Sequence, residues 1–166
     1  MLSCSGMGVF GSVKDGLQTM TDIPEALVNA LPEGGLRFSD RAEGALAGPG
    51  AYLLLVRMHK VMRIELARAP HLLPPRWYIY AGSANGPGGM AARVARHMRR
   101  EKKPHWHIDR ITCQIPPETA FCFPGHSECG LVESLVASNL FEFPLQGFGS
   151  SDCKVCESHL LRWRGP

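Results

Sequence analysis

The segment between Gly50 and His97 constrains the fold of this chain more than any other. Residues 51–58 form an apolar run long enough for a buried strand, and residues 77–81 are dense in aromatic and β-branched side chains. A glycine-rich turn at 85–89 then leads into a segment in which apolar residues recur at every fourth position from Met90. This order predicts an α/β fold with a small, mainly antiparallel central sheet flanked by helices.

The segments around this centre predict further elements. Residues 60–67 alternate apolar and charged side chains, which favours a hairpin that turns at 59–60 and is followed by a loop over 68–75. Beyond the basic helix we expect a short helix at 105–110, extended segments at 111–115 and 120–123, a helix at 127–140 facing inward through Val132, Leu135 and Val136, and a last strand at 158–163.

The chain of 166 residues is long enough for one domain with a substantial core. We expect an N-terminal extension over 1–47, with a short helix beginning near Pro24, and a single domain over 48–163. The first twenty residues lack a sustained period, and we assign them no function. No secretory signal and no apolar run of about 18 residues is found, so we expect a cytoplasmic protein with no membrane partner.

Four polar side chains lie where the expected strands and helix meet. Tyr52 follows Gly50 on the first strand, Tyr80 precedes Gly82 on the other, and Arg93 and His97 lie one turn apart on the helix. Because the planar fork of arginine suits phosphate and a tyrosine beside a cation can act on a nucleophilic water, the set suggests phosphodiester chemistry. We expect Arg93 in the first helical turn, where free N–H groups also favour an anion.

Each of these residues also has a structural interpretation. The tyrosines are equally typical of strand residues that pack a sheet, and Arg93 of a solvated helix face. His97 could contact phosphate, receive a proton or only close the site.

The pattern resembles the GIY-YIG nuclease superfamily, whose members carry Gly-x-Tyr on one strand, Tyr-x-Gly on the next and Arg-x-x-x-His on a helix. Within it the chain is similar to DUF123, a small GIY-YIG-like prokaryotic family in which some members are fused to an endonuclease III-type DNA glycosylase. The resemblance covers about residues 48–163. It implies a metal-dependent endonuclease with Tyr52, Tyr80, Arg93 and His97 in the catalytic site, where one tyrosine takes a proton from water and the other supports it.

The same resemblance implies a glutamate on a later helix that binds Mg²⁺ or Mn²⁺. The sequence offers Glu128, near the middle of the apolar stripe, and Glu133, at its edge and flanked by apolar residues. Glu133 matches the superfamily habit better. An unpaired Glu128 within the apolar stripe would also be costly to bury. Both remain candidates, and one carboxylate suffices because Mg²⁺ keeps several waters.

The chain also departs from the superfamily pattern. Ser83 stands where some members carry a lysine, and the turn over 86–89 lengthens the path from Tyr80 to Arg93. These departures keep a second hypothesis open, that of a catalytically silent nucleic-acid-binding module.

A second group of residues has the spacing of a zinc site. Cys153 and Cys156 are followed by His159, and one of His97, His105 or His107 would complete four ligands. A redox or packing role is an alternative for the two cysteines, and a third hypothesis is a zinc-stabilised interaction protein. A further alternative is that several His and Asp side chains of the two segments border the active cleft and bind substrate. They are His105, His107, Asp109, Asp152 and His159. We interpret Cys4, Cys113, Cys122 and Cys129 as reduced thiols.

The positive charge is concentrated in one segment, although the net charge is only +3. Six basic residues lie between Arg93 and Lys103, and Trp106 follows them, which predicts a nucleic-acid-binding surface with a base-stacking platform. The expected contact residues are Arg96, Arg99, Arg100, Lys102, Lys103 and Trp106. DNA is therefore the expected partner, and the glycosylase fusions of the resembling family imply base-excision repair proteins and the nucleoid as its surroundings. The alternative interpretation of the basic segment is a helix face whose charges are only exposed to solvent.

Overall fold

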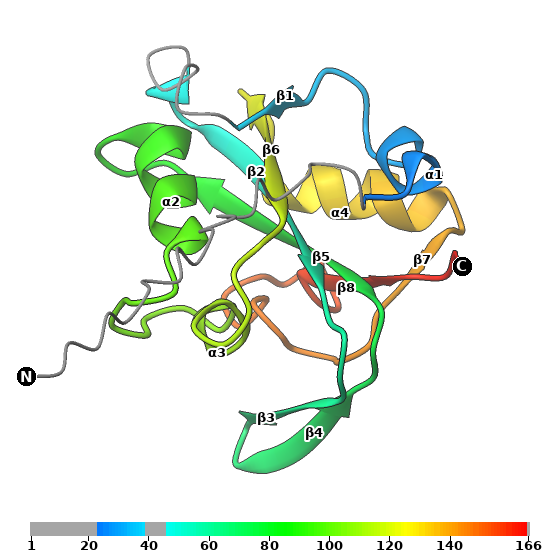
Figure 1. Cartoon of the computed structure of the whole chain (residues 1–166). Helices are drawn as coiled ribbons and strands as arrows, with labels where there is room; N and C mark the ends of the chain where they lie inside the picture. Colours follow the sequence, from blue (N-terminus) through cyan, green and yellow to red (C-terminus); the bar gives the residue numbers. More distant parts are fainter. Residues whose placement is uncertain (1–22, 39–45, 166) are drawn as a thin grey trace, which may run out of the picture.

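A computed structural model describes residues 23–38 and 46–165 and shows a six-stranded antiparallel sheet with helices on both faces (Figure 1). The expected α/β class is confirmed. The strand order is β1-β6-β2-β5-β8-β7. The strands are β1 (Leu36–Arg37), β2 (Gly50–Arg57), β5 (Trp77–Ala84), β6 (Thr119–Pro124), β7 (Phe141–Glu142) and β8 (Leu160–Trp163). The first twenty residues, to which we assign no function, lie outside the described residues.

The core lies on both faces of this sheet because β2 and β5 are central and all but one residue of each strand is buried. Alternate β2 side chains point to opposite faces, Leu54 to one and Leu53 to the other. The face of Leu54 is covered by α2 (Gly89–Met98) and α3 (Asp109–Thr112), and the face of Leu53 by α4 (Glu128–Ala137) and α1 (Glu25–Asn29). Figure 1 shows α2 and α4 on opposite sides of the sheet.

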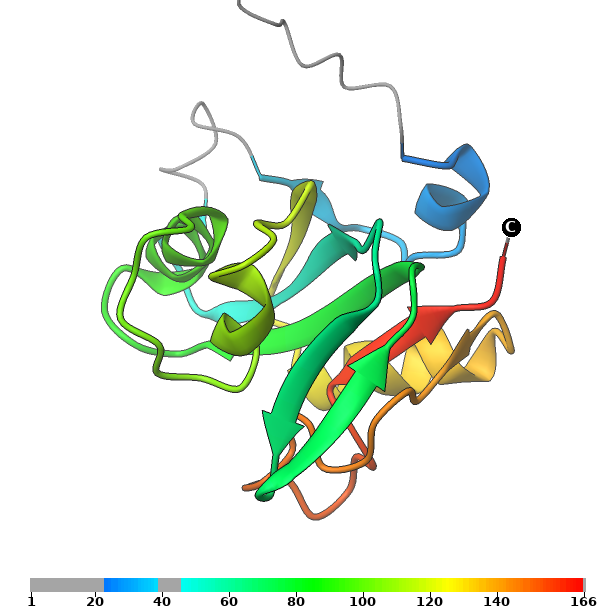
Figure 2. The same cartoon turned by 60° about the horizontal axis from the view of Figure 1, so that its bottom comes forward.

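The prediction of a hairpin that turns at 59–60 is wrong. Both edges of β2 are paired, with β5 and β6, so β3 (Met62–Leu66) pairs instead with β4 (Ala69–Leu73). The turn between them is at Ala67 and Arg68, which have φ of 50° and 65°. The strand β4 falls within the expected loop because its Pro70 is tolerated in a two-stranded hairpin, where every strand is an edge. This hairpin lies below the main sheet in Figure 1 and comes to the front in Figure 2.

Several element boundaries also differ. The expected extended segment at 111–115 is wrong, because Ile111 lies inside α3, which itself begins only at Asp109. The inward face of α4 uses Leu131 with Val132 and Leu135, while Val136 is 36% exposed. Strands β1 and β7 have two residues each, too few for a sequence period.

The N-terminal segment packs on the sheet. Leu27 of α1 is fully buried against α4, and β1 adds an edge strand to β6. No helix of the described residues has both the length and the apolarity needed to cross a membrane.

Because both faces of β2 are buried, we expect its leucines to dominate stability. Leu54→Ala removes a fully buried side chain and should lower the free energy of unfolding by about 2–5 kcal/mol. Leu72→Ala is the control, because Leu72 is 68% exposed on β4 and its truncation should change stability by no more than about 0.5 kcal/mol. Urea denaturation measures both, and equal losses would contradict this description of the core.

Candidate active site

A cavity of about 480 Å³ opens where the edge of β5 is unpaired. Strand β8 pairs with β5 at Tyr78–Tyr80, and the N–H of Ala81 still donates to the carbonyl of His159, so the edge of β5 lacks a partner on that side only beyond Ala81. The cavity is lined from the sheet by Tyr52, Tyr80 and Ser83. Arg93 of α2 and Glu128 of α4 line it from opposite faces of the sheet, and Trp106 lines it from the loop before α3. The loop between β7 and β8 closes the remaining side.

The register of β2 and β5 explains the two motif glycines. Tyr52 lies directly opposite Gly82, and a Cβ atom at Gly82 would lie 2.4 Å from the Tyr52 Oη. Likewise, a Cβ atom at Gly50 would lie 2.6 Å from the carbonyl oxygen of Phe123 and 2.7 Å from the sulfur of Met90. Gly82 therefore makes room for the phenol ring, and Gly50 permits the close approach of α2 and β6.

Tyr52 belongs to a buried chain of polar groups. Its Oη lies 3.0 Å from Nε2 of His97, and Nδ1 of His97 lies 3.3 Å from Oδ1 of Asp109. The Nδ1–Oδ1 contact lacks hydrogen-bond geometry, and the tautomer that carries its proton on Nδ1 is the one in which Nε2 accepts the hydrogen bond donated by Tyr52. The chain leads from the cavity wall into the interior, where His97 and Asp109 are both fully buried.

Asp109 is ionised in this chain because four donors surround it. Arg96 donates to both carboxylate oxygens, at 3.0 and 2.9 Å, and the backbone N–H groups of His105 and Trp106 donate to Oδ2. Burial raises the pKa of Asp109, but the Arg96 and backbone hydrogen bonds outweigh it and hold the pKa at about 2. Burial lowers the pKa of His97 to about 4, against the opposing charge of Asp109.

Arg93 is positioned in the cavity by stacking. Its guanidinium carbon lies 4.1 Å from the centre of the Trp106 ring, and that of Arg96 lies 4.4 Å from the same ring. Helix α2 begins at Gly89, so Arg93 starts the second turn and the expectation of a first-turn position is wrong. Any contact of Arg93 with an anion would therefore come from its side chain, because the N–H groups of the first turn lie before it and those of Gly89 and Met90 already bond to the carbonyls of Gly86 and Gly48.

Both tyrosine hydroxyls stay protonated at neutral pH. Tyr80 is 6% exposed, and its burial, with the charges of Asp109 and Glu128, raises its pKa to about 12. Burial also raises the pKa of Tyr52, followed in effect by the neighbouring Tyr80. Neither phenol is a standing base, and Tyr80 serves as a hydrogen-bond donor.

The two candidate glutamates lie in different places. Glu128, at the start of α4, lines the cavity with both tyrosines, whereas Glu133 is exposed and does not line it. Glu128 makes no hydrogen bond or ion pair with the described residues. Of the two, only its carboxylate is therefore free to act in this cavity.

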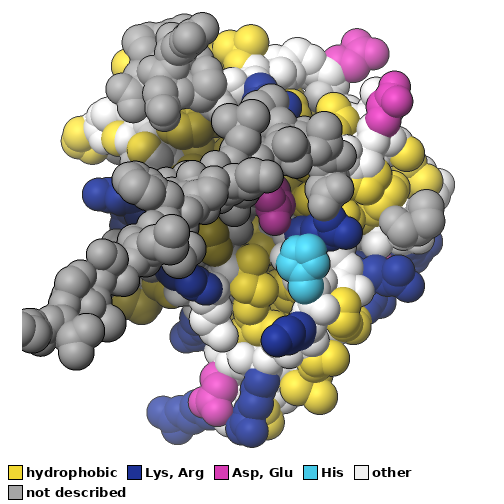
Figure 3. Space-filling view, in the orientation of Figure 1, with side chains coloured by type: hydrophobic (Ala, Val, Ile, Leu, Met, Phe, Trp, Pro, Cys, Tyr) yellow, Lys and Arg dark blue, Asp and Glu magenta, His cyan; other side chains and the backbone are white. Residues whose placement is uncertain are grey.

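In the basic segment, three of the six basic side chains are engaged in internal hydrogen bonds. Arg100 donates to the carbonyl of Gln114, and Lys102 donates to the carbonyl of His97 at the end of α2. Arg96 holds Asp109, while Arg99 and Lys103 are exposed. On the visible part of the face in Figure 3, Lys and Arg side chains are scattered among other residues. The internally bonded side chains act mainly in the structure of α2 and its flanking loop.

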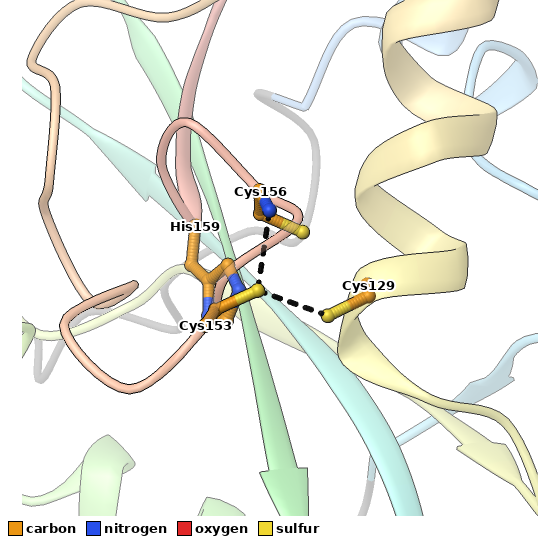
Figure 4. Close-up of side chains that lie close together, drawn as sticks. All are labelled: Cys129, Cys153, Cys156 and His159. Carbon is orange, nitrogen blue, oxygen red and sulfur yellow. Dashed lines mark hydrogen bonds between the residues drawn. The ribbon is translucent and has the colours of Figure 1, made fainter.

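A cluster of four residues borders the same cavity (Figure 4). Cys129 of α4 meets Cys153, Cys156 and His159 of the loop before β8, and their ligand atoms all lie within 4.8 Å of one another. Backbone N–H donors from Cys156 and Val155 lower the pKa of Cys153 to about 6. Burial raises the pKa of the Cys129 and Cys156 thiols.

The fourth residue of this cluster is Cys129, which differs from the expectation in the sequence analysis. We expected His97, His105 or His107 beside Cys153, Cys156 and His159, but none of these three histidines belongs to the cluster. His105 and His107 line an adjoining cavity of about 310 Å³, together with Asp152. Nδ1 of His107 accepts a hydrogen bond from the N–H of Gly149, which ties the loop to the segment before α3.

Two contributions had only a weak signal in the sequence. Cys129 follows Ser127, a capping residue whose side chain accepts a hydrogen bond from Gly130, so its place in the first turn of α4 was predictable although its partners were not. Asp109 was expected at the cleft, but it lies buried behind Trp106, where only the tertiary fold brings Arg96 and His97 to it.

A comparison with protein-family models matches residues 51–165 to DUF123, whose description is "Domain of unknown function DUF123". No curated protein and no solved structure matches the chain.

The buried His97 predicts a specific pH dependence of stability. Its pKa is lower in the folded chain, about 4, than the 6.5 of an unperturbed histidine, so between these values the unfolded chain binds the extra proton. The free energy of unfolding should therefore fall, by on the order of 3 kcal/mol, as the pH drops from 6.5 to 4. His97→Gln should lack this part of the slope in urea denaturation. Parallel pH profiles of the two proteins would contradict the assignment.

Proposed function

The chain belongs to the DUF123 family, and from the geometry of its cavity we propose that it is an endonuclease that hydrolyses phosphodiester bonds in DNA. One observation carries the proposal. The buried chain from Asp109 through His97 to Tyr52 ends at a cavity that also holds Arg93 and the unpaired carboxylate of Glu128. A proton acceptor, a cation and a carboxylate at one opening are what hydrolysis of a phosphodiester requires.

The buried chain can remove the proton from an attacking water. Because the raised pKa of Tyr52 excludes a standing phenolate, the proton must be relayed. As water gives a proton to the Tyr52 oxygen, Tyr52 passes its own proton to Nε2 of His97. The oxygen of the water then bonds to phosphorus while the bond from phosphorus to the departing sugar oxygen breaks, and that oxygen takes a proton from solvent. Burial disfavours the resulting imidazolium, as the lowered pKa of His97 shows, and the ionised Asp109 that it faces offsets part of this cost.

Two further side chains stabilise the developing charge. Arg93, held against Trp106, presents a fork that matches two phosphate oxygens. The Tyr80 hydroxyl, protonated throughout the physiological pH range, donates a hydrogen bond to a phosphate or departing oxygen. Both groups line the cavity, so both can reach the same phosphate.

The donor set of the cavity fits a hard divalent cation. Glu128 has no hydrogen bond or ion pair within the described chain, and Asp152 lines the same cavity. Carboxylate oxygens are the ligands that Mg²⁺ and Mn²⁺ prefer, with water and phosphate completing the set. When bound, such a cation supplies positive charge beside the reacting phosphate.

The internal bonds of the basic segment favour an enzyme over a binding module. A non-specific binding surface needs cations free to follow the backbone, yet Arg96, Arg100 and Lys102 are engaged within the protein. The association with base-excision repair rests on the resemblance alone, and a panel of DNA structures tests it.

Cleavage of labelled supercoiled, nicked, flap and branched DNA with Mg²⁺ or Mn²⁺ tests the proposal. We expect Tyr52→Phe, Arg93→Lys and Glu128→Gln each to lower the cleavage rate about 100-fold or more, because each removes one group at the reacting phosphate. Glu133→Gln is the matched control on the same helix and should cleave like the unaltered chain.

One result would contradict the proposed mechanism, and another would reject the function itself. Cleavage that survives Glu128→Gln unchanged would remove the carboxylate from the mechanism. Salt-sensitive DNA binding with no cleavage across the panel would establish the binding module instead.

A further inference from the structure

We propose that Cys129, Cys153, Cys156 and His159 bind one zinc ion in a closed Cys₃His site that fixes the loop between β7 and β8 to the start of α4. The proposal is independent of the nuclease hypothesis, since it concerns metal held by sulfur and nitrogen rather than the Glu128 carboxylate. It rests on the distances between the four side chains, on the hydrogen bonds to one sulfur and on an unpaired histidine nitrogen.

The distances suit a tetrahedral ion. Zinc–sulfur bonds of about 2.3 Å in a tetrahedron place two sulfur atoms about 3.8 Å apart. The sulfur atoms of Cys129 and Cys153 lie 3.5 Å apart, and the ligand atoms of all four residues lie within 4.8 Å of one another. Figure 4 shows the four side chains gathered between α4 and the loop. Shifts of less than an ångström would bring them to coordination distance.

The loop is shaped to hold a thiolate at Cys153. The backbone N–H groups of Val155 and Cys156 both point at its sulfur, at 3.4 and 3.2 Å. Two N–H donors converging on one sulfur stabilise negative charge there, and a thiolate is the form that binds metal. Zinc binding would release the remaining thiol protons to solvent and leave a centre with a single net negative charge.

His159 supplies the independent observation that points to a ligand. His159 is 5% exposed, and its buried Nε2 atom meets no hydrogen-bond geometry with the described residues, although its ring lies near enough to Cys153 to help lower the pKa of that thiol. A buried ring nitrogen without a partner costs free energy, and coordination of a metal removes that cost. Nitrogen with three sulfur ligands is a common donor set of structural zinc sites.

The position of the cluster indicates what the zinc would do. Residues 143–159 connect β7 to β8 without any regular secondary structure, and such long connections are uncommon unless they are functional or held by other bonds. One zinc ion would join this loop to α4 and so hold one wall of the cavity. With four protein ligands the site is closed, which is typical of structural rather than catalytic zinc.

The metal content of the full chain, purified under reducing conditions without chelator, tests the proposal. We expect about one zinc ion per chain by elemental analysis, and loss of most of it in Cys129→Ser and in His159→Ala. Cys113→Ser is the matched control, because Cys113 lies outside the cluster and should leave the zinc content unchanged.

A second measurement needs no variant and covers the case in which the variants fail to fold. Co²⁺ added to metal-depleted protein should give the intense visible bands of tetrahedral cobalt and the charge-transfer bands of cobalt–thiolate bonds. Zinc should then abolish both sets of bands. These spectra report the ligands directly and do not depend on DNA cleavage.

Three results would overturn the zinc site. The first is unaltered protein that contains no zinc and gives no cobalt–thiolate bands. The second is equal loss of zinc in Cys113→Ser and in the cluster variants. The third is a disulfide between Cys129 and Cys153 in freshly purified protein, detected by mass spectrometry after alkylation, because that bond would consume two of the proposed ligands.

Discussion

The buried carboxylate of Asp109 holds together the parts of the molecule on which the cavity depends. It binds Arg96 through both oxygens, contacts His97 and accepts the N–H groups that begin the turn into α3. A buried carboxylate is costly unless it is fully paired, and this one is paired from two separate segments. Its position therefore fixes α2 against the loop that carries Trp106, and with them the places of Tyr52 and Arg93 at the cavity.

Packing and proposed chemistry use the same residues in β2 and β5. Only a glycine at position 82 leaves space for the ring of Tyr52. In that position the Tyr52 hydroxyl forms its hydrogen bond with His97. A side chain at position 82 would push the phenol away from the imidazole, so the glycine of the motif contributes to the proposed proton relay without touching it. The structural and functional interpretations of Tyr52 are therefore compatible. Burial packs its ring in the core and also raises the pKa of its hydroxyl, which stays protonated.

Elements dominated by a local pattern were predictable from the sequence, and those decided by distant partners were not. The apolar runs of β2 and β5, the period of α2 and the cap of α4 are local, and all four elements were expected. The pairing of β3 with β4 depends on β2 having both edges occupied. In the cavity, Tyr52 and Arg93 follow from motif spacing, whereas the placement of Glu128 rather than Glu133 depends on where α4 meets the sheet edge. Cys129 could be identified only once the loop before β8 had been placed beside it.

The first turn of α4 couples the two groups of candidate ligands. Glu128 and Cys129 are consecutive, and successive helical residues point about 100° apart, so one turn can direct a carboxylate to the reacting phosphate and a sulfur to the cluster. The Ser127 cap and the buried Leu131 fix the axis of this turn. A zinc ion on Cys129 would fix its rotation, because the sulfur would then be bonded to a loop held by β8. In this arrangement the proposed zinc site would position Glu128 without contacting the proposed substrate, and the two proposed metal sites would share one cavity.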